Sequence, residues 1–296
     1  MTTQRKLPEW LKVRMPLGDN YENIKKLMGD QMLHTVCEEA RCPNIGDCWE
    51  RKTATYMILG DVCTRACTYC AVKTGKPTGL DLEEPLRLAK TVQSLGLKYA
   101  VITSVNRDDL PDGGAFIFGQ CIIQIKKLSP SCKVEVLTPD FEGNWNSLKT
   151  VVESKPDTFN HNIETVRRIF PKVRAKGDYQ MSIELLRKAK ELRPNLVTKS
   201  GMMVGLGETK DEIINTMKDL RAVNCNLLTI GQYLRPSTKH SPILKWYTPK
   251  EFDDLREIGE SLGFNHVASG PLVRSSYHAD EQHASAFVNE SLHSFD

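Results

Sequence analysis

The sequence lacks a long apolar segment. Across its 296 residues no run approaches the roughly 18 apolar residues of a membrane-spanning helix, and residues 1–10 contain no apolar signal core. It also lacks a strong charge of either sign, because 40 Lys and Arg residues against 37 Asp and Glu residues give a net charge of +3. A nucleic-acid-binding domain normally carries a clustered basic surface. These absences predict a cytoplasmic protein that binds neither a membrane nor a nucleic acid.

Cysteine, by contrast, is abundant. The chain has nine cysteines, and six of them fall between Cys37 and Cys70. In a cytosolic protein such clustering indicates metal binding or catalysis rather than disulfides. The other three, Cys121, Cys132 and Cys225, show no ligand spacing. We expect these three to be buried free thiols, which pack like small hydrophobic groups.

The more informative triplet is Cys63, Cys67 and Cys70, spaced C-x3-C-x2-C after the apolar segment 56–59. A structural zinc site needs four ligands, whereas a cubane cluster held by three thiolates keeps one iron open. The spacing, with Tyr69 before the last cysteine, resembles the radical S-adenosylmethionine (SAM) superfamily. This resemblance implies a [4Fe–4S] cluster whose open iron binds SAM and which cleaves SAM to a 5′-deoxyadenosyl radical. A zinc knuckle or three unrelated thiols are the alternatives.

Another triplet, Cys37, Cys42 and Cys48, comes first along the chain, so we call it the first triplet and Cys63, Cys67 and Cys70 the second. The first triplet is spaced C-x4-C-x5-C in a turn-rich segment. The spacing differs from the C-x2-C pairs of zinc sites, although with His34 the three could hold one zinc ion. A turn-rich loop suits wrapping around a compact cluster. Spacing alone leaves an iron–sulfur cluster and a zinc site open.

From residue 54 onward strand signals alternate with helix signals. Strands are expected at 55–59, 99–103, 133–137, 158–162, 198–204 and 226–231. Helices are expected at 84–94, 114–128, 145–153, 181–191, 212–222 and 249–262. Thr209 with Glu212, and Thr248 with Glu251, are predicted capping boxes at two of the helix starts. A further short apolar segment follows at 266–268.

Six strand–helix units in succession predict an α/β fold with a parallel sheet and helices outside it. The fold class we expect is a partial (β/α)6 barrel of the TIM type, which is also what the radical SAM resemblance implies. We divide the chain into an N-terminal extension with the first triplet (1–53), the barrel (54–265) and a C-terminal extension (266–296).

In such barrels the site lies at the carboxyl ends of the strands. Polar side chains placed there suit a zwitterionic nucleoside such as SAM, because carboxamides and carboxylates bind hydroxyl and ammonium groups and Lys binds a carboxylate. The candidates are Thr103, Asn106, Asp108, Asn162, Glu164, Lys199 and Gln232. Each of them could instead be a loop residue that caps a helix.

Both triplets, together with Arg274-Ser275-Ser276-Tyr277, closely resemble the lipoyl synthase family. Segments 105–110 and 160–165 resemble it as well, and the resemblance runs from about residue 8 to about residue 284. It implies that Cys37, Cys42 and Cys48 hold an auxiliary [4Fe–4S] cluster whose fourth iron is bound by Ser276, with Ser275 as the alternative. The catalytic residues implied are Cys63, Cys67, Cys70 and Ser276.

The resemblance further implies insertion of two sulfur atoms at C6 and C8 of a protein-bound octanoyl group, with the auxiliary cluster as sulfur donor. The implied partners are octanoylated carrier domains of 2-oxoacid dehydrogenases and of the glycine cleavage system, a ferredoxin or flavodoxin reductant, and an iron–sulfur carrier that rebuilds the auxiliary cluster. A basic run, Arg167, Arg168, Lys172 and Arg174, either docks an acidic carrier domain or faces water.

Three other functions fit parts of the pattern. Another radical SAM enzyme with an auxiliary cluster would share both triplets. A zinc-stabilised binding protein would use both triplets structurally. An electron-transfer protein would carry two clusters, but it would need neither incomplete triplets nor a large barrel.

Overall fold

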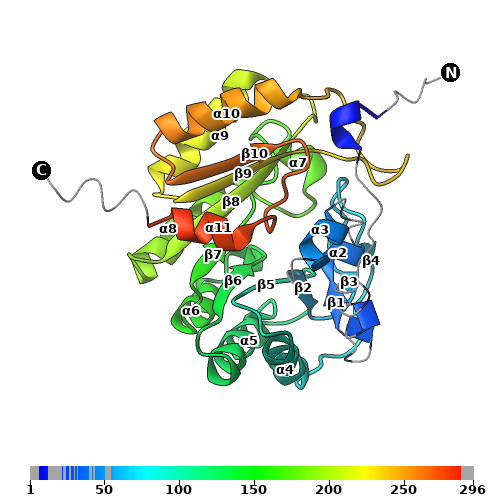
Figure 1. Ribbon diagram of the computed structural model, residues 1–296, viewed down its shortest axis with the longest axis vertical. Helices are drawn as coiled ribbons and strands as arrows, with labels where there is room; N and C mark the ends of the chain where they lie inside the picture. Colours follow the sequence, from blue (N-terminus) through cyan, green and yellow to red (C-terminus); the bar gives the residue numbers. More distant parts are fainter. Residues whose placement is uncertain are drawn as a thin grey trace, which may run out of the picture.

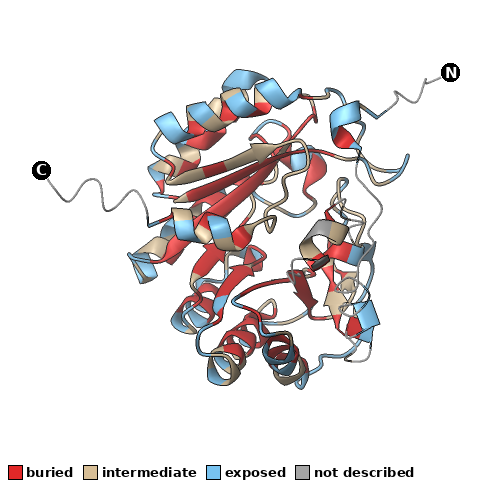
Figure 2. Cartoon of the chain, viewed as in Figure 1, coloured by how far each residue is buried: buried red, intermediate tan, exposed pale blue. Residues whose placement is uncertain are grey.

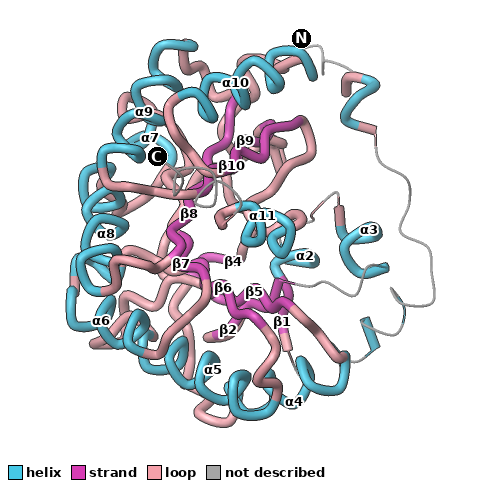
Figure 3. The backbone as a smooth tube through the Cα atoms, turned by 60° about the vertical axis from the view of Figure 1, so that its left-hand side comes forward, coloured by secondary structure: helices cyan, strands magenta, loops and turns pink. Residues whose placement is uncertain are grey.

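The fold is a curved parallel sheet with helices on its outside. In this computed structural model the described residues are 7–12, 22, 25, 26, 28, 29, 31, 33–39, 42, 44–50 and 55–287. The main sheet has eight strands in the order β1-β2-β5-β6-β7-β8-β9-β10. Figure 3 shows the strands at the centre of the molecule, with the long helices around them. The α/β fold and the partial barrel expected from the sequence are confirmed.

The parallel strands run in chain order across the sheet. They are β2 (Thr55–Ile58), β5 (Tyr99–Ser104), β6 (Lys133–Leu137), β7 (Thr158–Asn160), β8 (Val197–Val204), β9 (Leu227–Gln232) and β10 (His266–Gly270). Each pairs in parallel with the next, as β2 does with β5 and β9 with β10. The last, β10, contains the apolar segment 266–268. The sheet therefore has one more parallel strand than the six predicted units.

The helices bury one face against the sheet and expose the opposite face (Figure 2). The long ones are α4 (Glu84–Leu95), α5 (Ala115–Leu128), α6 (Trp145–Glu153), α8 (Tyr179–Leu192), α9 (Lys210–Ala222) and α10 (Pro249–Ser261). Both predicted capping boxes are present, Thr209 with Glu212 on α9 and Thr248 with Glu251 on α10. No helix within the described ranges has the length and apolar character needed to cross a membrane.

Short elements complete the structure at both ends of the chain (Figure 1). Near the N-terminus lie η1 (Glu9–Leu11), β1 (His34–Thr35), α2 (Val36–Glu39) and α3 (Ile45–Glu50). The strand β1 pairs antiparallel with β2. The two extensions that we predicted thus each add a strand to the sheet. Their boundaries stay predictions, and parts of 1–53 and of 266–296 lie outside the described residues.

The C-terminal segment crosses the sheet on the face opposite to α10. On the α10 side, Gly259 packs against Val267 of β10. On the other side, a Cβ at Gly231 of β9 would collide with the carbonyl oxygen of Val273. Glycine at position 231 therefore lets the chain after β10 lie directly on β9. The final helix, α11 (Ala279–Ser285), follows, and its Ala279 packs with Tyr99 and Val101 of β5.

Candidate active site

The loop that carries Cys63, Cys67 and Cys70 leaves β2 through a left-handed turn. Leu59 has φ 68° and Gly60 has φ 87°. Left-handed backbone is unfavourable for a branched residue such as leucine, and Leu59 is held there by its contact with Gly114, at the start of α5. Its amide also donates to the buried carboxylate of Glu84, at 2.8 Å. The turn directs the chain into β3 (Val62–Cys63), which pairs with β4 (Lys73–Thr74).

Backbone hydrogen bonds fix this loop to the barrel on several sides. The amide of Thr64 donates to the carbonyl of Asn106 (3.0 Å), and the amide of Thr68 donates to the carbonyl of Val173 (2.8 Å). The His240 Nε2 atom lies 2.9 Å from the Cys70 carbonyl oxygen. The Cys63 sulfur accepts from the amide of Asn106 at 3.4 Å.

Both cysteine triplets and the serine motif meet in one cavity of about 480 Å³. This volume lies within the range of small-molecule sites. Five of the six clustered cysteines contribute to its wall, together with both serines. They are Cys37, Cys42, Cys63, Cys67, Cys70, Ser275 and Ser276. Cys48 is half-buried in α3 and does not line the cavity.

Five of the seven predicted SAM-binding residues also line this cavity. These are Thr103, Asn106, Asn162, Glu164 and Gln232. Two of the five already have structural roles, because the Thr103 hydroxyl donates to the carbonyl of Leu137 (2.9 Å) and the Gln232 side chain donates to and accepts from the backbone.

In two of the other three, a side-chain oxygen is available to a ligand, whereas the carboxylate of Glu164 already has side-chain hydrogen bonds with Asn162 and Tyr69. The side-chain oxygens of Asn106 and Asn162 are buried without a hydrogen-bond partner among the described residues, and so is the hydroxyl of Ser104 beside them. Buried polar atoms normally have partners. Orphaned oxygens on a cavity wall therefore fit a polar ligand with hydroxyl or amino groups.

Glu164 is strained and partly buried. Its φ is 66°, which a non-glycine residue adopts at a cost that functional sites often retain. Burial raises the pKa of its carboxyl, whereas the nearby guanidinium of Arg174 acts in the opposite direction. A cationic group such as the ammonium of an amino acid would stabilise the carboxylate here.

The remaining two candidates lie elsewhere. Lys199 is near the start of β8, fully buried, and its Nζ is 3.0 Å from Glu135 Oε1. Burial lowers the pKa of Lys199, and Glu135 opposes that shift. Asp108 binds Arg65 at 2.9 Å instead of facing the cavity. Strand-end position therefore brings together five of the seven residues and leaves out Lys199 and Asp108.

The raised pKa values of the thiols in both triplets are compatible with binding of a cluster of soft metal cations. Burial raises the pKa of Cys37 to about 11 and that of Cys70 to about 12, and it raises the pKa of Cys42 and Cys67. Buried thiols of this kind ionise when a metal supplies the compensating charge. Within the part of the chain that the structure describes, no three His, Cys, Asp or Glu side chains converge on a single-ion site.

Sequence reasoning missed two arginines at this site. The Arg174 side chain donates to the carbonyl of Asn162 at 2.5 Å and lies 3.3 Å from His161 Nε2. The Arg65 guanidinium is buried between two carboxylates. Arg65 lies between two cysteines of the motif. Its partners are 43 and 75 positions away and could not be identified from local sequence.

Comparisons with known proteins agree with this geometry. Residues 57–220 match the model of the Radical SAM superfamily, and residues 1–42 match that of the N-terminal domain of lipoyl synthase. The lipoyl synthase of Rubrobacter xylanophilus is 60% identical over 93% of this chain and 86% of its own length. The lipoyl synthase of Halalkalibacterium halodurans is 57% identical over 96% of this chain and 94% of its own length.

Solved structures of more distant proteins share the fold. Streptococcus suis SuiB bound to its precursor peptide SuiA has a TM-score of 0.58 at 12% identity, covering 77% of this chain and 52% of that one. Methylornithine synthase has a TM-score of 0.52 at 14% identity, covering 76% of each chain.

These matches resolve the functional alternatives. The zinc-stabilised binding protein and the two-cluster electron carrier find no support in them, and relatives 56–60% identical over nearly the whole chain separate it from other radical SAM enzymes. This chain belongs to the lipoyl synthase family of the radical SAM superfamily.

Proposed function

We propose that this enzyme inserts two sulfur atoms, at C6 and C8, into an octanoyl group carried on a protein domain, and that an auxiliary [4Fe–4S] cluster is the sulfur donor. Membership of the radical SAM superfamily implies one [4Fe–4S] cluster and SAM. When bound, these two supply the one-electron chemistry that opens an unactivated C–H bond, which has no proton acidic enough for acid–base catalysis. The protein's own residues hold the groups, orient them and exclude water.

In this proposal Cys63, Cys67 and Cys70 hold the radical SAM cluster. The free carboxamide oxygens of Asn106 and Asn162 bind polar groups of SAM, and the carboxylate of Glu164 binds its ammonium group. All six residues lie on the same cavity wall, which supports the assignment. Thr103 and Gln232 shape that wall through their hydrogen bonds to the backbone.

Cys37, Cys42 and Cys48 hold the auxiliary cluster, and Ser276 binds its fourth iron, with Ser275 as the alternative. Both serines line the cavity that Cys37 and Cys42 share with the other triplet. A serine oxygen is a harder ligand than a thiolate and a weaker partner for this iron. An iron that has to leave while its cluster gives up sulfur suits such a ligand.

The cavity also has an apolar wall suited to a hydrocarbon chain. Met57, Val105, Leu137 and Met203 lie among the polar residues that line it. An octanoyl chain bound there would be removed from water, and its reacting carbons would be held between the two groups of cysteines. This arrangement is what a radical reaction on an unactivated carbon requires of the protein.

We propose the partners that follow from this reaction. They are octanoylated carrier domains of 2-oxoacid dehydrogenases and of the glycine cleavage system, a ferredoxin or flavodoxin reductant and an iron–sulfur carrier, all in the cytoplasm. In the basic run, Arg167 pairs with Asp219 and Arg168 with Glu212, while Arg174 turns inward to His161. These internal pairings favour a solvated face over a docking surface.

The observation that carries the proposal is that cysteines of both triplets line one cavity with the serine motif. The test is Cys37→Ala, assayed by mass spectrometry on an octanoylated carrier domain. We expect SAM cleavage to continue and sulfur insertion to fall to background. Cys132→Ala, which removes a buried thiol outside the cavity, is the matched control. Normal lipoyl yield from Cys37→Ala would overturn the sulfur-donor role.

A further inference from the structure

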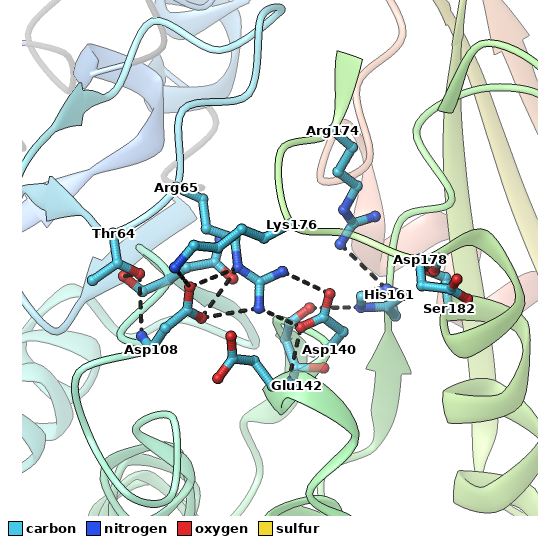
Figure 4. A network of polar contacts seen from close by, with 12 residues as sticks. Thr64, Arg65, Asp108, Asp140, Glu142, His161, Arg174, Lys176, Asp178 and Ser182 are labelled. Carbon is cyan, nitrogen blue, oxygen red and sulfur yellow. Dashed lines mark hydrogen bonds and ion pairs between the residues drawn. The ribbon is translucent and has the colours of Figure 1, made fainter. Parts of the chain in front are cut away.

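Arg65 ties the cysteine loop to the ends of two barrel strands (Figure 4). It lies between Cys63 and Cys67, and only 1% of its side chain is exposed. Its Nε and Nη2 atoms donate to Asp108, which follows β5, at 2.9–3.1 Å. Its Nη1 and Nη2 atoms donate to Asp140, which follows β6, both at 2.7 Å. The guanidinium therefore makes two-pronged contacts with two carboxylates.

The ion-pair network of Arg65, Asp108 and Asp140 requires arginine at its centre. A guanidinium presents its donors in a rigid planar fork, whereas a lysine ammonium is a point charge that cannot bind two carboxylates bidentately. Removing one partner of a buried ion pair leaves an uncompensated charge, which is strongly unfavourable. Burial alone would raise the pKa of Asp140, but its hydrogen bonds with Arg65 lower that pKa to about 2. Asp140 is thus a firmly ionised anchor.

The backbone that presents Asp140 is strained. Directly after it, in the 3-10 turn η2 (Phe141–Gly143), Phe141, Glu142 and Gly143 have φ values of 50°, 51° and 76°. The left-handed region is unfavourable for the two non-glycine residues among these three. Such strain persists where the surrounding structure determines the conformation, and it is common at functional sites. This turn gives independent evidence that the position of Asp140 matters.

Further polar contacts extend from this network toward the residues proposed to bind SAM. Lys176 Nζ lies 3.6 Å from Asp108 Oδ2. The fully buried ring of His161, which follows β7, places Nδ1 2.9 Å from the carbonyl oxygen of Thr138. On its other side His161 faces Arg174, which also holds the carbonyl of Asn162. The cysteine loop and the Asn162–Glu164 segment are thus connected by one network of polar contacts, in which Arg65 also lines the cavity.

We propose that Arg65, Asp108 and Asp140 form a positioning clamp, which sets the placement of the Cys63–Cys70 loop and hence of the open iron relative to the SAM-binding side chains. Arg65 contributes to the wall of the cavity, whereas Asp108 and Asp140 do not line it. The role proposed for all three is to position the loop. This inference rests on the radical SAM cluster of the proposed function and does not depend on the auxiliary cluster.

The test uses the full-length protein, reconstituted without oxygen and reduced. The readout is the electron paramagnetic resonance signal of the cluster as SAM is added, because only a cluster with an open iron responds to SAM. For Arg65→Lys we expect the half-saturating SAM concentration to rise about tenfold. This change lies within the range of coupling measured between residues that are in contact with each other. Arg168→Lys is the matched control, because Arg168 makes a two-pronged contact with Glu212 on the exposed surface.

A second variant, Asp140→Asn, tests the clamp in case Arg65→Lys does not fold. Asp140→Asn keeps the size of the side chain and removes the charge, and it should shift the SAM titration in the same direction while Asp108→Asn, less buried, shifts it less. If Arg65→Lys and Asp140→Asn fold and titrate as the wild type does, even with a lower melting temperature, the residues are merely structural and the clamp is wrong. A wild-type signal that does not respond to SAM would instead overturn the proposed function itself, and the clamp with it.

Discussion

The two cysteine triplets share a cavity but are held in different ways. The Cys63–Cys70 loop is fastened to residues that follow β5 and β6, through Asn106 and the Arg65 pairs, and to Val173 at the end of the short helix α7 (Phe170–Val173). Among the described residues around the first triplet, the Cys42 amide donates to the Cys37 carbonyl and the Cys48 amide to the Asn44 carbonyl. Contacts of longer range there include the pairing of β1 with β2 and a bond from Asn44 Nδ2 to the carbonyl oxygen of Leu272 at 2.7 Å.

This difference matches the two roles that we propose. A loop that must present an open iron to SAM in every cycle benefits from a rigid support, as catalytic constellations do. A cluster that gives up its sulfur has to be taken apart and replaced. The bond of Asn44 points to the segment that continues into Ser275 and Ser276, so it ties the cysteines of the first triplet to their proposed fourth ligand.

The largest expected effect comes from breaking one triplet at a time. We expect Cys67→Ala to lower SAM cleavage by more than ~100-fold, because loss of a ligand exceeds the 10–100-fold typical of residues that only support a ligand. Cys48→Ala should leave SAM cleavage near the wild-type rate and remove the auxiliary iron. Cleavage of SAM with 5′-deoxyadenosine as product, together with iron analysis, checks both. Equal loss of SAM cleavage in the two variants would erase the distinction between the triplets.

The protein's stability should depend on pH through His161, which belongs to the polar network beside the Cys63–Cys70 loop. Burial, together with the Arg174 charge, lowers the pKa of His161 to about 3, against about 6.5 in the unfolded chain. The unfolded state therefore binds more protons between these values, and stability should fall as the pH drops below about 6.5, by up to ~1.4 kcal/mol per pH unit.

Urea unfolding between pH 6.5 and 4.5 measures this contribution. The carboxyl of Asp140, whose pKa is lowered to about 2, does not titrate in that window. His161→Gln should show a shallower loss of stability than the wild type. Parallel pH profiles for the two proteins would mean that His161 is not buried in its neutral form.

A smaller effect is expected from the bond that joins Asn44 to Leu272. Asn44→Ala removes the hydrogen bond to Leu272, which should lower the free energy of unfolding by ~0.5–1.5 kcal/mol. We also expect faster loss of auxiliary iron to a chelator, with SAM cleavage unchanged. Gln93→Ala is the control, because its carboxamide donates to the carbonyl of Leu128 far from the cavity. Iron loss at the same rate in both variants would show that Asn44 does not secure the cluster segment.

Regular periodicity and helix caps made much of the fold predictable from sequence. The strand at 133–137 and the helix at 145–153 appear with the expected bounds. The strand predicted to reach Asn162 ends at Asn160, because the backbone turns away toward Glu164. The two-residue strands β1, β3 and β4 carry too little periodic signal to be recognised.

The site was predictable only where the order along the chain determines position. Asn106, Asn162 and Glu164 follow strands directly, so their place at the cavity could be inferred. Lys199 lies near the start of β8 rather than at its Val204 end, and it pairs with Glu135 across the sheet. Asp108 is at the expected end, but its partner is 43 residues away. Pairings of buried charges over such separations are set by tertiary packing.

In the function that we propose, two clusters act together in one enzyme. The most direct test of this function is the iron, acid-labile sulfide and zinc content of protein purified without oxygen. Two cubane clusters predict about eight irons and about eight sulfides per chain, with no stoichiometric zinc. Zinc without iron would contradict the account, since both triplets would then be structural metal sites.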